Sequence, residues 1–385
     1  MAGWQAMSWR RGSDQPHVRS VLPEARGYRC GSSARGTPRK RGSVNGTASA
    51  RGPPARPGEQ HVAAATPVGV AERGSARNGS AAECGIRQED MMILVTGAAG
   101  KAGSAVVRAF ARRGAPVRAV VRDPARVPWL AELPGVTVVA GDLRRAATLG
   151  PALEGVKRAL LISSPREEMV DTQLSFIDAA QAAGVPHIVK YSGREAGVGF
   201  DQEVFRGTRW HGQIERYLER SGLAWTHLRP SQFMQNYLPS SVTGFDVTTR
   251  ELVMPLGAGQ LSPVDLADVA EIAVGVLTTD GHENKAYDIT GPEALTMAEV
   301  ADRVSAATGA TFRYVEVTFE EQRRRYAAAG LPPHVVDLFD EQFRERHRTP
   351  IARVELAAHR TFGVTPTHFA QFASAHAEEF TGSAR

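Results

Sequence analysis

The sequence predicts an α/β fold with a doubly wound parallel sheet, and two observations support this. A glycine-rich turn at residues 96–103 lies between a short apolar run and an alanine-rich helical stretch. After this turn, short and almost fully apolar runs alternate with helical stretches, a pattern typical of a parallel sheet covered by helices on both faces. Ligands of such sheets bind in the crevice at the carboxyl ends of the strands.

The glycine-rich turn follows the apolar run 92–95 and opens the helical stretch 101–113. Its first glycine permits a tight turn, its second lets backbone N–H groups approach a pyrophosphate, and its third lets the helix pack closely on the strand. The partial positive charge of the helix N-terminus then holds the phosphates. The pattern predicts a Rossmann dinucleotide site with contacts from Gly97, Ala99, Gly100, Lys101, Ala102 and Gly103.

The next elements follow from apolar runs and capping signals. Such runs predict five more parallel strands, at 116–121, 136–140, 159–162, 187–191 and 224–228. Helices are expected between them at 146–153, 171–183 and 210–220. A further helix is expected after Asp123, because aspartate caps helix N-termini and Pro124 suits the first turn.

From about Phe245 the rhythm changes. The expected elements are a loop with Gly257 and Gly259, a helix at 264–278, a strand at 286–290, a helix capped by Thr296 that ends near residue 308, a strand at 312–317, and charged helices through Pro332 and Pro333. These pieces are too few for a large independent core. We therefore expect residues 91–244 to form the dinucleotide-binding domain, and residues 245–385 to form a smaller substrate lobe that completes the sheet and closes over the cofactor.

Residues 1–90 differ in composition from the rest of the chain. They are rich in Arg, Gly, Ser and Pro and show no helical or strand period, so we expect a disordered tail that need not belong to the natural protein. The tail holds 13 Arg and 1 Lys against 7 acidic residues, a net charge of +7, whereas the remainder has 32 basic and 34 acidic residues. The tail lacks interleaved aromatic residues, so no specific nucleic-acid partner is expected.

The distribution of cysteines and apolar residues limits the chemistry. Both cysteines, Cys30 and Cys84, lie in the tail, so the folded part has no disulfide and no thiolate nucleophile. The histidines and carboxylates show no metal-ligand spacing, and no metal is expected. No apolar stretch is long enough to span a membrane. We expect a cytoplasmic monomer or homodimer that acts on a small molecule.

The residue after the second strand indicates which nicotinamide cofactor binds. An acidic side chain there binds the ribose of NAD, whereas an arginine accommodates the 2′-phosphate of NADP. Arg122 holds this place, so NADP(H) is expected, with NAD(H) possible; Asp123 fits better as a helix cap. Lys101 could add a second positive charge. Further cofactor contacts are expected where the later strands end, at Asp142, Leu143, Ser163, Ser164 and Ser192.

Several sequence runs together resemble the NmrA-like group of atypical short-chain dehydrogenases, from about residue 92 to 380. They are TGAAGKAG at 96–103, VRDPAR at 121–126, GDL at 141–143, SGLAWTHLRPSQFMQNY at 221–237, DLADVAE at 265–271 and GHENKAYDITGPEALT at 281–296. Within that group the chain is similar to the triphenylmethane-reductase and quinone-reductase branches. The resemblance implies reduction of flat, electron-poor aromatic compounds.

The usual catalytic pair of short-chain dehydrogenases is missing. That pair is a Tyr followed four residues later by a Lys that lowers the pKa of the phenol, and none of the seven tyrosines has a Lys at that offset. Lys190 and Tyr191 are adjacent, so alternation along a strand places them on opposite faces. Tyr191 is then either packing or a substrate contact.

The resemblance instead implies a catalytic role for His211. Related reductases carry a Lys fifteen residues before the Thr of the next strand, the quinone-reductase branch carries a His, and His211 precedes Thr226 by that interval. An imidazole can orient a carbonyl oxygen or donate a proton near neutral pH. The alternative is that His211, at the start of the predicted helix, is only a cap. The family's pocket segment corresponds to Phe233, Asn236 and Tyr237, which could also be core residues.

Three functions remain open at this point. The leading hypothesis is an NAD(P)H-dependent reductase that transfers hydride to a quinone-like or conjugated acceptor. The second is a non-catalytic redox sensor that binds the dinucleotide, as NmrA itself does, and the missing Tyr/Lys pair favours it. The third is isomerase or biosynthetic chemistry, because the fold does not determine the reaction.

Overall fold

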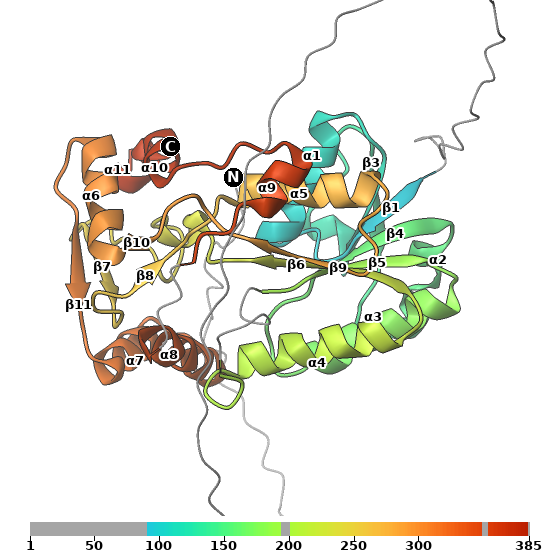
Figure 1. Ribbon diagram of the computed structural model, residues 1–385, viewed down its shortest axis with the longest axis horizontal. Helices are drawn as coiled ribbons and strands as arrows, with labels where there is room; N and C mark the ends of the chain where they lie inside the picture. Colours follow the sequence, from blue (N-terminus) through green and yellow to red (C-terminus); the bar gives the residue numbers. More distant parts are fainter. Residues whose placement is uncertain (1–90, 194–200, 349–352, 384–385) are drawn as a thin grey trace, which may run out of the picture. The chain divides into compact units, whose positions relative to one another are not determined.

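A seven-stranded parallel sheet forms the centre of the fold, in the order β3-β2-β1-β4-β5-β6-β9 (Figure 1). The computed structural model describes residues 91–193, 201–348 and 353–383. The expectations for residues 1–90 lie outside this part. The strands are β1 (Met92–Val95), β2 (Val117–Val121), β3 (Val136–Ala140), β4 (Val156–Leu161), β5 (His187–Tyr191), β6 (Ala224–Pro230) and β9 (Lys285–Ile289). This order and direction confirm the doubly wound prediction.

Helices cover both faces of this sheet (Figure 1). One face carries α1 (Lys101–Arg112), α5 (Leu266–Thr278) and α9 (Ala357–Phe362); the other carries α2 (Gly150–Leu153), α3 (Met169–Ala182) and α4 (Arg206–Arg220). Alternate strand residues face the two cores, so Val189 packs in the first and Ile188 in the second.

Two predicted helices are much shorter in the structure. After Asp123 the chain forms only two 3₁₀ turns, Pro124–Arg126 and Pro128–Leu130, because Pro128 disfavours a helical conformation at the residue before it. Asp123 nevertheless caps the first turn, where its carboxylate accepts the Ala125 N–H at 3.1 Å. The helix expected at 146–153 consists of a 3₁₀ turn, Ala146–Thr148, and the single turn α2.

The chain after residue 244 contributes to two cores. Strand β9 pairs with β6 at the edge of the large sheet, and helices α5 and α9 pack on one of its faces. Most of the other segments build a separate core rich in phenylalanine. Phe245, Phe312 and Phe380 lie in this separate core, and the Phe245 ring meets the other two edge to face. Among the described residues, no helix is both long and apolar enough to cross a membrane.

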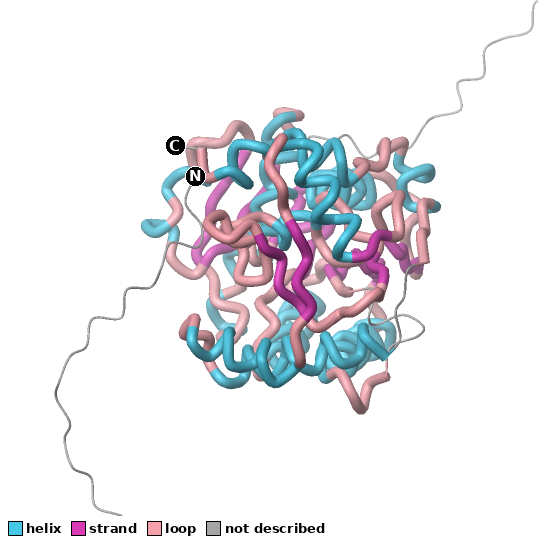
Figure 2. The backbone as a smooth tube through the Cα atoms, turned by 90° about the vertical axis from the view of Figure 1, so that its left-hand side faces the viewer, coloured by secondary structure: helices cyan, strands magenta, loops and turns pink. Residues whose placement is uncertain are grey.

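Small strand pairs and helices form the scaffold of the separate core. Strands β7 (Glu251–Met254) and β11 (Arg313–Glu316) pair in parallel, and β8 (Gln260–Leu261) and β10 (Leu295–Thr296) pair antiparallel. Helices lie above and below the strands on this side of the fold (Figure 2). They are α6 (Met297–Thr308), α7 (Phe319–Ala328), α8 (Pro333–Arg348), α10 (Phe369–Ala375) and α11 (Ala377–Thr381). The predicted cap Thr296 forms a capping box with Glu299 at the start of α6.

Candidate active site

The glycine turn between β1 and α1 has the backbone geometry that a pyrophosphate requires. Gly97 has a φ of +60°, and a Cβ on Gly103 would lie 2.2 Å from the carbonyl oxygen of Gly97. Gly100 is the N-cap of α1, no side chain caps the helix, and its first turn contains no acidic residue. The N-terminal amides of α1 are therefore left for an anion, and a dinucleotide fits the turn.

The other predicted contacts of the turn lie around these glycines. Ala99 and Lys101 are exposed, and Ala102 is half-buried. The Lys101 side chain is therefore available to a phosphate, whereas Ala99 and Ala102 have only their backbone groups to offer.

Arg122 and Asp142 follow neighbouring strands of the sheet, β2 and β3. Arg122 is exposed, and its charge contributes to lowering the pKa of Asp142. The larger cause of that lowered pKa is Arg144, which sequence reasoning missed and whose Nη2 lies 3.0 Å from Oδ2 of Asp142. Leu143 between them is half-buried. The structure thus places two arginines at the end of the sheet where the adenosine ribose is expected.

Ser163 and Ser164 follow β4, and Ser192 follows β5. The Ser163 hydroxyl accepts a hydrogen bond from Nε2 of Gln173 at 2.8 Å, Ser164 is exposed, and Ser192 is buried. The parallel topology brings all three to the edge of the sheet where Gly97 and Arg122 also lie. Their contacts with a cofactor remain predictions.

A contact between the fully buried Lys190 and the half-buried His211 is the main feature that sequence reasoning did not predict. Lys190 of β5 is fully buried, and its Nζ lies 3.2 Å from Nδ1 of His211 on α4. The same Nζ donates to the backbone carbonyl of Tyr191 at 3.1 Å. The prediction that Lys190 and Tyr191 lie on opposite faces is confirmed, since Tyr191 packs in the core beneath α1 and α5.

The position of His211 on α4 removes one alternative. Helix α4 begins at Arg206, four residues earlier than the sequence indicated, so His211 lies in its second turn and does not cap it. A usable signal was present in the sequence. Alternation places Lys190 on the face that α4 covers, and the helical period places His211 on the side of α4 that faces the sheet.

Burial determines where the proton of this pair resides. Burial lowers the pKa of Lys190 to about 7, against the opposing effect of the Glu215 charge. Burial and then the Lys190 charge lower the pKa of His211 well below its ordinary value. At neutral pH the imidazole is therefore neutral, and a proton held by the pair lies on Lys190. Because an ammonium can only donate, Nδ1 of His211 accepts and Nε2 carries the hydrogen.

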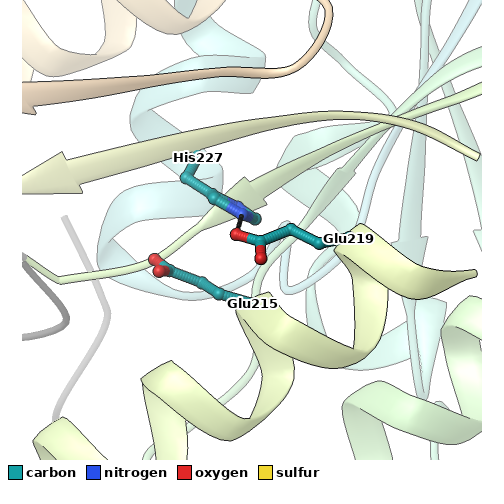
Figure 3. A group of neighbouring side chains, drawn as sticks. All are labelled: Glu215, Glu219 and His227. Atoms are coloured by element: carbon teal, nitrogen blue, oxygen red, sulfur yellow. Dashed lines mark hydrogen bonds and ion pairs between the residues drawn. The ribbon is translucent and has the colours of Figure 1, made fainter.

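A layer of charged residues continues from this pair between α4 and β6 (Figure 3). Glu215 binds Arg229 through both oxygens, with Oε1 3.1 Å from Nε and Oε2 2.6 Å from Nη2. Nε2 of His227 lies 3.1 Å from Oε1 of Glu219. Burial alone would raise the pKa of Glu215, but Arg229 and His227 together lower it, so Glu215 is ionised.

The same residues have the residue types of a metal site. One ligand atom each of Glu215, Glu219 and His227 lies within 4.8 Å of the others (Figure 3). However, the guanidinium of Arg229 occupies both oxygens of Glu215 and is itself a cation at this position. The geometry is that of an ion-pair network.

Aromatic residues of the predicted substrate pocket divide into two kinds. Tyr237 is fully buried in the separate core and meets Phe369 edge to face at 5.4 Å, and its buried hydroxyl has no hydrogen-bond partner among the described residues. Phe233 and Asn236 are half-buried. The ring centroid of Tyr191 lies 6.4 Å from that of Phe233, and the buried Tyr191 hydroxyl has no hydrogen-bond partner among the described residues. A ligand or water at the sheet edge would satisfy that hydroxyl.

Comparisons with known proteins agree with this fold. The sequence model of the NmrA-like family matches residues 89–348. The chain is 39% identical over 289 residues to an NAD(P)H azoreductase of Xenophilus azovorans, covering 75% of this chain and 99% of that protein. It is 37% identical over 291 residues to a (4-alkanoyl-5-oxo-2,5-dihydrofuran-3-yl)methyl phosphate reductase of Streptomyces griseus. That match covers 75% of this chain and 99% of the reductase.

A solved structure shares the fold over the same region. It is an NADPH-dependent quinone oxidoreductase of Escherichia coli in complex with NADPH, with a TM-score of 0.65 and 27% sequence identity. The match covers 74% of this chain and 99% of that chain.

Proposed function

Because the chain belongs to the NmrA-like family, we propose that it is an NADPH-dependent reductase of small conjugated acceptors such as quinones, azo compounds or enones. The general class, an NAD(P)-binding oxidoreductase, is that of its relatives. The observation that carries the finer proposal is the contact between Lys190 and His211. It places a hydrogen-bond donor near the carboxyl end of β5, in a fold whose glycine turn fits a dinucleotide.

The residues that would hold the cofactor follow from the site. The turn from Gly97 to Gly103 would bind the pyrophosphate, and Arg122 would pair with the 2′-phosphate, which favours NADPH over NADH. Bound NADPH supplies a hydride to the acceptor. Phe233 and Asn236 would line the acceptor pocket, with Tyr191 beside them.

His211 would act on the acceptor atom that gains negative charge during reduction. Its Nε2–H is free of the Lys190 contact, which engages only Nδ1. A donor there can orient a carbonyl oxygen or an azo nitrogen and then protonate it. The protein would orient the acceptor against the cofactor, and the redox chemistry belongs to the cofactor.

Steady-state kinetics with the purified protein test the proposal. NADPH oxidation is followed with a panel of quinones, azo dyes and enones, and NADPH affinity is measured by calorimetry on the same preparation. Turnover with members of the panel is the expected result. Tight NADPH binding without turnover of any acceptor would instead assign the protein to the redox sensors.

A further inference from the structure

His211 by itself is a poor proton source. Burial and the neighbouring Lys190 charge keep its imidazole neutral at neutral pH, and a neutral imidazole that loses its Nε2 proton becomes an anion unless Nδ1 gains one. The atom in contact with Nδ1 is Nζ of Lys190, at 3.2 Å. Any proton that leaves Nε2 can therefore be replaced at Nδ1 from the buried lysine.

We propose that Lys190 is a positioning residue that holds Nδ1 of His211 as an acceptor and replaces the proton that Nε2 gives to the acceptor. This inference rests on the proposed function. It adds a role for a residue that would act on the acceptor only through His211.

The surroundings of Lys190 argue against a purely structural role. A buried lysine is normally stabilised by a direct ion pair, because an uncompensated charge in the interior is costly. Within the part of the chain that the structure describes, the hydrogen bonds of Nζ go to the Tyr191 carbonyl and to His211. Glu215 is charged and close enough to favour the ammonium, but Arg229 binds both of its oxygens.

The other charged groups of this layer complete the electrostatic setting. Lys190 on β5 is paired with His227 on β6, so both lie on the sheet face that α4 covers. Arg229 lies on the same face of β6, and Glu215 and Glu219 of α4 form ion pairs with Arg229 and His227. Glu219 is engaged by His227, at 3.1 Å. The two carboxylates are thus held by Arg229 and His227, and Lys190 keeps its proton available for His211.

The proposed proton transfer conserves protons and electrons. The Nε2–H bond of His211 breaks as a new O–H or N–H bond forms on the acceptor, and Nδ1 takes a proton from Nζ of Lys190. The acceptor also receives a hydride, so it gains two electrons and two hydrogens, and the dinucleotide is oxidised by two electrons. The step leaves His211 with its hydrogen on Nδ1 and Lys190 as a neutral amine. Before the next turnover Nε2 takes a proton from solvent and Nδ1 returns its proton to Nζ of Lys190, which restores the starting state.

The first test is nuclear magnetic resonance of the histidine ring in the full chain without any cofactor. With ¹⁵N-labelled histidine, Nδ1 of His211 should show the shift of an accepting nitrogen and Nε2 that of a protonated one. The Nδ1 shift should change as Lys190 loses its charge near pH 7. In Lys190→Met the preference for the Nε2–H form should weaken, and the imidazole should protonate at higher pH because the neighbouring cation is gone.

The second test is the pH dependence of turnover. The kcat of the wild type should fall as the pH rises through about 7, because Lys190 loses its proton there. Lys190→Met should lower kcat by about 10²-fold and abolish that pH dependence, with KM and NADPH affinity nearly unchanged. Lys190→Arg is the conservative variant, because a guanidinium can donate a hydrogen bond to Nδ1 but does not give up its proton. Compared with Lys190→Met, it should restore the ¹⁵N shifts of the His211 ring but not kcat. Lys157→Met, at an exposed position of β4, is the matched control.

The outcomes separate the inference from the proposed function. If Lys190→Met turns over the acceptors as fast as the wild type does, the inference is wrong and the proposed reductase function is unaffected. If the wild type is inactive but shows the expected ¹⁵N shifts of the His211 ring, the proposed function is wrong and only the contact between Lys190 and His211 is supported. A histidine spectrum that shows Nδ1 protonated in the wild type overturns the inference without any activity measurement, even if the variants do not fold.

Discussion

Lys190 and His227 are paired residues on the neighbouring strands β5 and β6, so both side chains lie on the sheet face that α4 covers. Such an interface between helix and parallel sheet is ordinarily apolar. Here α4 carries His211, Glu215 and Glu219 at intervals of four residues, and His211 contacts Lys190 while Glu219 contacts His227. The result is a line of polar groups that runs from the candidate active site towards the partly exposed Glu219.

Replacement of Arg122 tests the choice of cofactor. If its guanidinium binds the 2′-phosphate, Arg122→Ala should weaken NADPH binding by roughly 1.5–3 kcal/mol, the scale of a hydrogen bond to a charged group. NADH binding should hardly change, and calorimetric titration of both cofactors measures the difference. Arg126→Ala, an exposed neighbour, is the control, and equal losses for NADPH and NADH would refute the assignment.

Substitution of His211 tests the reductase chemistry. His211→Ala should lower kcat/KM by about 10²-fold or more, with NADPH affinity nearly unchanged, because a general acid acts only on the reacting acceptor. His211→Gln should recover part of the activity if orientation matters more than proton transfer. Arg216→Ala, on the exposed side of the same helix, serves as the control. Full activity in His211→Ala would leave the residue a structural role only.

A methyl group at Gly103 tests the glycine turn. The Cβ of Gly103→Ala would lie 2.2 Å from the Gly97 carbonyl oxygen and 2.9 Å from Cα of Ala98, so the turn or the helix must shift. We expect a loss of about 1–3 kcal/mol of unfolding free energy, together with weaker NADPH binding. Gly150→Ala is the control, because its Cβ would meet no atom within 4 Å. Urea denaturation measures the change in stability, and calorimetry measures NADPH binding. Unchanged NADPH affinity in Gly103→Ala would contradict the proposal that the glycine turn binds the pyrophosphate.

His187 should make the fold sensitive to acid. Burial and then the charge of Arg158 lower its pKa to about 4, while its Nε2 lies 2.9 Å from the Thr226 hydroxyl. Below the ordinary histidine pKa of about 6.5 the unfolded chain binds the proton that the folded chain refuses. Stability should therefore fall as the pH drops from about 6.5 to 4, by up to about 3 kcal/mol for this residue.

Urea denaturation at a series of pH values measures this loss. His187→Gln keeps a polar group but cannot titrate, so its unfolding free energy should vary less with pH over the same range. His334→Gln, at an exposed position of α8, provides the comparison. If His187→Gln retains the full pH dependence of the wild type, the loss of stability in acid arises elsewhere.

The amino-acid sequence by itself determined the sheet, the glycine turn and the end of β2. These features depend on neighbouring residues: the period of apolar side chains, the conformational freedom of Gly97 and the place of Arg122 after a strand. Where local signals competed, they were less reliable. Pro128 shortened the helix expected after Asp123.

Only the tertiary structure decided the partners of the candidate site. Lys190 and His211 are 21 positions apart, and the short contact between them requires α4 to cross β5 at one register. Asp142 likewise pairs with Arg144, in a loop that no periodicity describes. The alternation of β5 gave the face on which Lys190 lies, but its lowered pKa results from burial beneath α4. Burial and distance arise from packing between elements, and for that reason the proton-carrying pair is visible only in the folded chain.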